Sequence, residues 1–213
     1  MNVLLGRKIA MTQSFSEEGT LLPVTVIQAG PCRVLDLRTK EKNGYEAAVL
    51  GFEQVEGSKL KSKPGLGFFK KLGSPVFKVI REFRGMQAKI NQEVSVEVFK
   101  AGDLLQIQGM SRGKGWAGAI KRWNFSRGRE THGGNFNRAL GSTGNNTWPA
   151  RTIPGRRMSG RLGYEKVSIK NVEVLSVIPE DNLLIVKGPI PGGENGLLTI
   201  RKIAERKAKA ASE

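Results

Sequence analysis

The chain has almost no cysteine or histidine: Cys32 and His132 are the single residues of their kinds among 213. One cysteine excludes an internal disulfide bond, and one residue of each type cannot supply the usual four ligands of a structural zinc site. We therefore expect no metal site and no cofactor. Cys32 stands in an apolar-rich run, which predicts a small residue of the hydrophobic core.

Long apolar runs are missing as well. No segment approaches the roughly 18 apolar residues that span a bilayer, and the basic residues alternate with glycine instead of lining an amphipathic helix. The first residues, Met1–Lys8, have no charged leader, long apolar stretch or small-residue cleavage site. These features predict a protein of the reducing cytoplasm that does not bind a membrane.

Acidic and aliphatic residues are scarce between Ser111 and Gly163. This 53-residue segment contains eleven Lys and Arg but one acid, Glu130, so it carries +10 of the net charge of +16. It has eleven glycines and only seven residues of the Val, Ile, Leu, Met and Phe set. Ordering the backbone costs roughly 1–2 kcal/mol per residue, which so few apolar side chains do not offset. The segment is predicted to be disordered alone or to be ordered by a polyanionic partner.

The remainder of the chain has the pattern of a β protein. Short β-branched or alternating runs end at turn residues, which is typical of strands. The predicted strands lie near Leu4–Met11, Leu22–Gln28, Arg33–Arg38, Tyr45–Phe52, Val76–Phe83, Val94–Phe99, Leu104–Gln108, Lys166–Ile178, Leu183–Lys187 and Leu197–Arg201.

Strands on both sides of the basic segment predict one discontinuous β domain, residues 1–110 and 164–204. The segment 111–163 then leaves this domain as an arm and returns to it. The predicted fold class is mainly β: a closed β-barrel, in preference to a sandwich, with a long irregular basic arm inserted between strands and minor helical content.

The connections of this domain are predicted from their turn and charge signals. Asn43-Gly44 indicates a tight turn between two strands. Glu53–Gly73 is expected to be a long basic loop, either solvated or in contact with phosphate. The tail, Arg201–Glu213, is expected to form a frayed helix or to be disordered, with residues 205–213 flexible.

Two features of the arm invite an enzymatic interpretation that their surroundings do not support. Gly113–Gly118 matches the pattern G-x-G-x-x-G, which holds a dinucleotide when a long helix follows and an acid lies about 20 residues on. Here the only acid downstream within the segment is Glu130, which is too close, and helical periodicity ends after Phe125. No nucleophile and supporting carboxylate cluster near His132, so we expect it to hydrogen-bond, to stack on a base, or to be solvated. The prediction is that the chain is not an enzyme.

The positive signal is the interleaving of basic, aromatic and glycine residues in Trp116–Phe125. Arg and Lys neutralise phosphates, planar rings stack on bases, and Asn reads base or sugar edges, a combination suited to irregular folded RNA. Proteins that read duplex DNA favour a helix with a few specifying side chains, so DNA is not expected. Alternatively, Trp116, Ile120 and Trp123 form a small apolar face at helical spacing that fixes the root of the arm. Trp148, far from any apolar neighbour in the sequence, is the better candidate for stacking.

Four motifs of the arm, in the order in which they occur, resemble the arm of the bacterial large-subunit ribosomal protein number three. They are Lys121-Arg122-Trp123-Asn124-Phe125, Thr131-His132-Gly133, Gly141-Ser142-Thr143-Gly144 and Gly155-Arg156-Arg157-Met158-Ser159-Gly160. The flanks agree in Gly6-Arg7-Lys8-Ile9-Ala10-Met11-Thr12, Pro23-Val24-Thr25-Val26-Ile27 and Asn182-Leu183-Leu184-Ile185-Val186-Lys187-Gly188. The resemblance covers essentially the whole chain, and an ordered set of this kind is more specific than any one piece.

The resemblance implies a structural constituent of the large ribosomal subunit. Its β-barrel domain would lie on the subunit surface, bind the 3′ region of the 23S-type rRNA and nucleate assembly. The family's arm extends inward, and its tip approaches the peptidyl transferase centre, which is made of RNA. Neighbouring large-subunit proteins, including numbers fourteen and nineteen, are the implied protein partners.

The tip of the arm departs from the family pattern. Many bacterial members have a glutamine, a methylation target, two residues before a Thr-Pro-Gly step. Here the glutamine position is Thr147 and the step reads Trp148-Pro149-Ala150, so glutamine methylation is not expected.

The predicted rRNA-binding residues fall into two groups. Asn124, His132 and Trp148 are expected to contact bases or sugars. The second group consists of cations that are expected to contact phosphates and of residues close in sequence to the predicted contacts. Its members are Arg112, Lys114, Trp116, Lys121, Arg122, Trp123, Arg138, Asn146, Thr147, Arg151, Arg156, Arg157 and Arg161. A free RNA chaperone or translation factor that uses the arm transiently is the main alternative, and an RNA-acting enzyme with His132 as base is a third.

Overall fold

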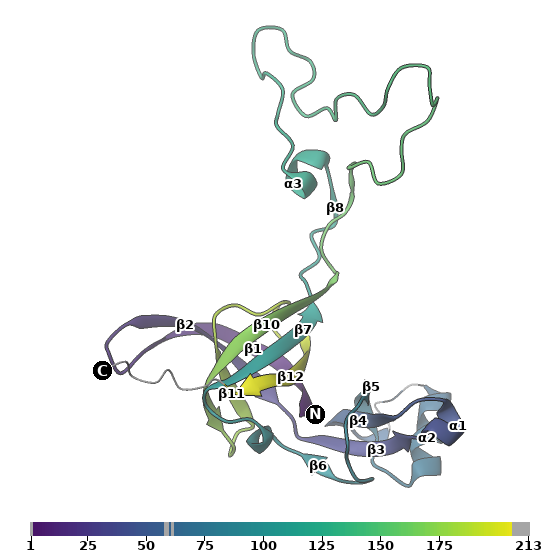
Figure 1. Ribbon diagram of the computed structural model, residues 1–213, viewed down its shortest axis with the longest axis vertical. Coiled ribbons are helices and arrows are strands. Elements are labelled where there is room, and N and C mark those ends of the chain that lie inside the picture. The colour runs from purple at the N-terminus through teal and green to yellow at the C-terminus, as the bar shows by residue number, and fades with distance from the viewer. Residues whose placement is uncertain (1, 58–59, 61, 206–213) are drawn as a thin grey trace. The chain divides into compact units, whose positions relative to one another are not determined.

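The computed structural model describes residues 2–57, 60 and 62–205, and the chain divides into two compact units. One unit comprises the chain before Ser111 and after Glu165, and the other is Ser111–Glu165. Figure 1 shows that the first unit carries the long strands, whereas the second is largely irregular. The prediction of a mainly β chain with minor helical content is confirmed.

Six antiparallel strands of the first unit form a sheet that closes on itself. Their order around this ring is β1 (Val3–Phe15), β12 (Leu197–Glu205), β7 (Asp103–Met110), β10 (Lys166–Ile178), β11 (Leu183–Lys187) and β2 (Leu21–Ala29), which pairs with β1 again. Alternation of side chains decides what is buried: β7 buries every second residue from Asp103 to Gly109. The fully buried interior includes Leu4, Ile27, Leu105, Ile107, Leu184, Leu198 and Ile200.

Irregularities in the pairing accompany the curvature of this ring. The register shifts between Lys8 and Ala10 in β1, and similar shifts occur in β10 and β12. A bulge places an extra residue in one strand, which bends that strand and increases its local twist. The ring is therefore built from strands that curve at defined positions.

A second, four-stranded sheet lies beside the ring in the same unit, in the order β5 (Phe77–Arg84), β4 (Ala47–Gln54), β3 (Cys32–Arg38) and β6 (Glu93–Val94). The two sheets share one hydrophobic cluster, to which the second sheet contributes Cys32, Val34, Leu50, Phe52 and Phe83. The placement of Cys32 in the core is confirmed.

An ion pair also joins the two sheets. The Arg7 guanidinium on β1 donates to both carboxylate oxygens of Glu53 on β4, with 2.9 Å between Nη2 and Oε2. Both side chains are about three-quarters buried.

The prediction of a loop over Glu53–Gly73 is wrong, because Lys63–Leu72 form helix α2. Ser62 caps the helix by accepting a backbone N–H at 3.4 Å, proline occupies the first turn, and Gly73 ends it in the left-handed region. Phe69 anchors it in a small cluster with Leu35, Val49 and Phe77. One proline and two glycines within ten residues had hidden the helical periodicity.

Three other expectations differ from the structure. The strand predicted over Val94–Phe99 ends at Val94, and Val96–Val98 form a 3₁₀ turn. Asn43-Gly44 is not a two-residue turn but the end of helix α1 (Lys40–Asn43). The frayed helix predicted from Arg201 is wrong as far as Glu205, because β12 continues to that residue. The flexible tail predicted beyond it, residues 206–213, lies outside the described residues.

Candidate nucleic-acid interface

The unit Ser111–Glu165 begins as a two-stranded stalk. Ser111 N–H donates to the Glu165 carbonyl at 2.8 Å, and Leu162 exchanges backbone bonds of 2.9 Å with Lys114 and Gly115. The ladder continues as strands β8 (Trp116–Ala117) and β9 (Gly160–Arg161). Backbone bonds therefore hold the outgoing and returning limbs together with little apolar burial.

Glycine is required in this stalk at position 163. Gly163 has φ of +72°, in the left-handed region. A Cβ atom there would collide with the carbonyl group of Arg112. The close approach of the two limbs thus depends on the absence of a side chain.

A cluster around Trp123 fixes the limbs above the stalk. Trp123 ends helix α3 (Ala119–Trp123), and its indole Nε1 donates to the Met158 carbonyl at 2.9 Å. Arg122 donates to the same oxygen at 3.1 Å. The guanidinium carbons of Arg122 and Arg157 lie 4.9 and 5.4 Å from the centroid of the indole ring, within the range of cation–π attraction.

Beyond this cluster, the chain closes a small loop between Gly128 and Asn137. Gly128 N–H donates to the Asn137 carbonyl at 2.9 Å, and the Phe136 ring covers Gly128 so closely that a Cβ would not fit. His132 lies in this loop with an exposed side chain and a φ of +58°. The loop presents His132 to solvent, and the described residues offer its ring neither a hydrogen bond nor an ion pair.

The tip of the arm is held by backbone carbonyls. Arg156 donates to the Ser142 carbonyl, and Ser142 Oγ donates to the Gly144 carbonyl at 3.0 Å. Trp148 is 85% exposed, and its ring makes no stacking contact, cation–π contact or hydrogen bond within the described part of the chain. The largest apolar side chain of the tip is therefore left in solvent.

The structure brings only some of the predicted residues together. Arg122 and Arg157 meet at the Trp123 ring, Arg122 and Trp123 also share the Met158 carbonyl, and Trp116 faces Arg161 across the β8–β9 pair. Fifteen of the sixteen predicted side chains are exposed, and Arg122 is half-buried. Their contacts with RNA remain predictions: Arg112, Lys114, Trp116, Lys121, Arg122, Trp123, Asn124, His132, Arg138, Asn146, Thr147, Trp148, Arg151, Arg156, Arg157 and Arg161.

One sequence alternative is wrong. Trp116 lies in a strand, not in the helix, and is 78% exposed, so it does not share a helical apolar face with Ile120 and Trp123. The G-x-G-x-x-G pattern likewise lies in the stalk and leads into a helix of only five residues, too short to place a pyrophosphate at its N-terminus as the dinucleotide motif does.

The charge of the arm is almost uncompensated. Arg127 pairs with Glu130, whereas none of the other ten cations between Ser111 and Gly163 has a carboxylate partner among the described residues. Cations that are exposed and unpaired pay little desolvation cost to meet phosphate.

Sequence reasoning missed three residues of this surface. Arg129 is an exposed cation of the same kind as those predicted, and Tyr164 lies under the Arg161 guanidinium at 4.7 Å. Met158 contributes through its backbone carbonyl, for which no sequence signal exists. The position of Arg129 in the basic segment was an available signal, and Tyr164 directly follows that segment.

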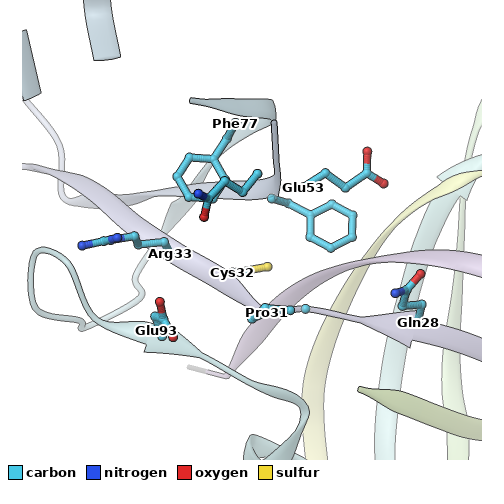
Figure 2. Close-up of a pocket in the computed structure, with 10 residues that line it drawn as sticks. Gln28, Pro31, Cys32, Arg33, Glu53, Phe77 and Glu93 are labelled. Atoms are coloured by element: carbon cyan, nitrogen blue, oxygen red, sulfur yellow. The ribbon is translucent and has the colours of Figure 1, made fainter. Parts of the chain in front are cut away.

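The pocket shown in Figure 2 is a different kind of site. It is lined by residues of β3, β4 and their neighbours, and Cys32 is one of them. Burial raises the pKa of the Cys32 thiol to about 12, and the thiol faces the Leu5 carbonyl at 3.8 Å. A protonated, buried thiol is a packing group and not a nucleophile.

The described residues contain no cluster of three or more His, Cys, Asp and Glu arranged to bind a metal ion. None of the helices they form is both long and apolar enough to cross a membrane.

Comparison with known proteins places the chain in a family. The family model "Ribosomal protein L3" matches residues 78–181. The "Large ribosomal subunit protein uL3" of Desulforapulum autotrophicum is 45% identical over 202 residues, which cover 93% of this chain and 97% of that protein. The chain belongs to the uL3 family of ribosomal proteins.

Membership settles the general role. A uL3 protein is a structural constituent of the large ribosomal subunit and is not an enzyme. It acts in translation as part of the ribosome, which is cytoplasmic in bacteria. The enzymatic alternative based on His132 is therefore wrong.

Proposed function

We propose that the arm, Ser111–Glu165, is the main rRNA-binding element of this uL3 protein. In this proposal the protein binds the 3′ region of the large-subunit rRNA early in assembly, and the tip of its arm extends toward the peptidyl transferase centre. The closed ring of strands serves as the β-barrel domain at the subunit surface. Large-subunit proteins fourteen and nineteen are proposed as neighbours.

The observation that carries the proposal is the set of ten arm cations that have no carboxylate partner among the described residues, displayed on a segment with little core of its own. Each cation placed at a phosphate releases condensed counterions, which favours binding most strongly at low salt. The segment is poor in apolar side chains, so bound RNA would supply the contacts that a core supplies elsewhere.

Different parts of the arm are proposed to make different contacts. Exposed cations of the stalk and the limbs bind phosphates. Trp148 stacks on an unpaired base, because an 85% exposed indole without a ring contact or hydrogen bond among the described residues offers a free face for stacking. His132 and Asn124 bind base or sugar edges. Arg122 has the smaller free surface, since it also braces Met158.

The decisive experiment is ultraviolet crosslinking in cells, followed by sequencing of the attached RNA and mapping of the crosslinked residues. Crosslinks from Trp148 and the arm to one region of large-subunit rRNA support the proposal. Crosslinks scattered over messenger and transfer RNAs would favour the free chaperone instead.

A salt titration tests the electrostatic part. Replacement of Lys121, Arg138 and Arg151 by glutamine should reduce the slope of log affinity against log salt by roughly 2–3, at 0.7–0.9 per phosphate contact. The matched control replaces three exposed lysines of the other unit, Lys42, Lys89 and Lys100. Equal reductions in both triple variants would show that the arm is not the main electrostatic contact.

A further inference from the structure

The longest segment without a cation lies at residues 9–32. These 24 residues contain no Lys, Arg or His, and their only charges are Glu17 and Glu18. Elsewhere the chain has 35 Lys and Arg in 189 residues, so about four would be expected here. A surface selected to meet phosphate would not lack cations over such a length.

This segment forms a hairpin that continues beyond the ring. β1 pairs with β12 only over Val3–Arg7, and β2 pairs with β11 only over Val24–Gln28. From Ala10 to Phe15, β1 is paired with β2 alone. Figure 1 shows these two strands running on together past the other strands of the ring.

One face of the hairpin extension is apolar and exposed. Phe15 pairs with Leu21, and the alternation of side chains places Met11 on the same face as Phe15. Their exposed fractions are 48% for Met11, 72% for Phe15 and 49% for Leu21. Together with Thr12, Gln13 and Pro23, Met11 and Leu21 line a shallow hollow.

The charge around this face indicates the class of its partner. Glu17 and Glu18 lie exposed at the turn, and neither forms an ion pair within the described chain. Carboxylates repel phosphate, and aliphatic side chains gain little from an RNA backbone. The apolar face and the two glutamates together favour a protein as the partner, with apolar side chains at the centre of its surface and Lys or Arg at the rim.

We propose that the hairpin extension, Ala10–Pro23, is a protein-docking surface that binds another protein of the large subunit. The partner presents an apolar patch to Met11, Phe15 and Leu21 and basic side chains to Glu17 and Glu18. A two-stranded ribbon alone has marginal stability in water, so docking also supports the ribbon itself. This inference concerns another surface than the arm and does not depend on the arm's contacts with RNA.

The test places a photo-crosslinking benzoylphenylalanine at position 15 of the full chain, in cells where this chain replaces the native copy. Large subunits are irradiated, purified, washed in high salt and digested with ribonuclease. A crosslink to one subunit protein, in a peptide that combines apolar residues with Lys or Arg, is the expected result. Crosslinks to rRNA fragments or to a second copy, or no crosslink at all, would overturn the proposal.

Two sets of variants test the contact energetically. Phe15→Ser with Leu21→Ser should lower retention of the crosslinked neighbour in salt-washed subunits by at least about tenfold. Ile90→Ser is the matched control, because Ile90 is an exposed apolar residue of the same unit outside the hairpin, at 57%. Equal retention in the double variant and the control would contradict docking through this face.

Charge reversal separates protein from RNA. Glu17→Lys with Glu18→Lys should also reduce retention of the neighbour, because the partner's rim is basic. If RNA covered the hairpin, the same change would instead strengthen the contact. Incorporation of each variant into the subunit is measured first. A variant that disturbs the binding of the arm to rRNA lowers incorporation, whereas a variant that disturbs only the hairpin contact is incorporated normally and lowers retention of the neighbour alone.

Discussion

Replacement of Trp123 by leucine is expected to loosen the arm without disturbing the other unit. The change removes the hydrogen bond from Nε1 to the Met158 carbonyl and the contacts of the ring with Arg122 and Arg157. A net hydrogen bond contributes about 1 kcal/mol and each exposed cation–π contact about 0.5 kcal/mol. Their sum, about 2 kcal/mol, corresponds to a local opening on the order of 30-fold more populated.

Hydrogen exchange of the full chain without RNA measures this opening. The amides to follow are Leu162, which donates to Gly115 in the stalk, and Asn124, which donates to Ile120 at the end of α3. Leu162 should exchange on the order of 30-fold faster in Trp123→Leu, because its hydrogen bond joins the two limbs and breaks when they separate. Asn124 should also exchange faster, because the end of α3 is no longer held by the indole.

Trp116→Leu is the matched control for this experiment. The Trp116 ring is 78% exposed and makes no ring contact or hydrogen bond among the described residues, so its loss should leave exchange unchanged. If Trp116 contacts RNA, the control weakens RNA binding while the free arm stays as ordered as before. Unchanged exchange in Trp123→Leu, or equal acceleration in both variants, would refute the idea that the indole holds the limbs together.

Three further predictions concern pairing, backbone space and burial. The Arg7 guanidinium lowers the pKa of the Glu53 carboxyl. At pH values above the ordinary carboxyl pKa of 4.5, the pair should therefore stabilise the fold by about 1 kcal/mol. That contribution should disappear as pH falls through the lowered pKa. Urea denaturation of the wild type and Glu53→Gln across pH 2–7 measures it: the difference between their free energies of unfolding should shrink only on the acid side. Gly163→Ala should open the stalk, because the new Cβ meets the Arg112 carbonyl; faster exchange at Leu162 than in the wild type is the readout, and wild-type protection would contradict it. Cys32, whose thiol pKa is raised to about 12 by burial, should react with iodoacetamide at pH 8 only after unfolding, and rapid labelling of the native chain would disprove its burial.

Several features of the fold followed from local sequence. The alternation in Leu104–Gln108 and the continuous pattern of Lys166–Ile178 predicted strands that the structure contains, because the period of two directly reflects which side chains face the interior. Helix α2 was missed for an equally physical reason: Phe69 is anchored by contacts with Leu35, Val49 and Phe77, which are distant in sequence. The shortness of β6 similarly depends on its single neighbour, β3.

The candidate site divides in the same way. Its charge was readable from composition, since eleven cations against one acid need no structure to be counted. The special position of Trp123 was not readable, because its partner is the backbone carbonyl of Met158, 35 residues away and chemically identical to every other carbonyl. The exposed face of the β1–β2 hairpin was also hidden, since Met11 and Leu21 have the apolar character of residues that are normally buried.

The sequence by itself determined the mainly β character, the buried role of Cys32 and the concentration of positive charge in the arm, because these depend on side-chain chemistry and on local periodicity. Only the tertiary structure decided how six strands close into a ring, which tryptophan braces the arm and which is left in solvent, and where the apolar hairpin extends beyond its neighbours. These outcomes depend on contacts between residues far apart in the chain, whose free energies no local pattern contains.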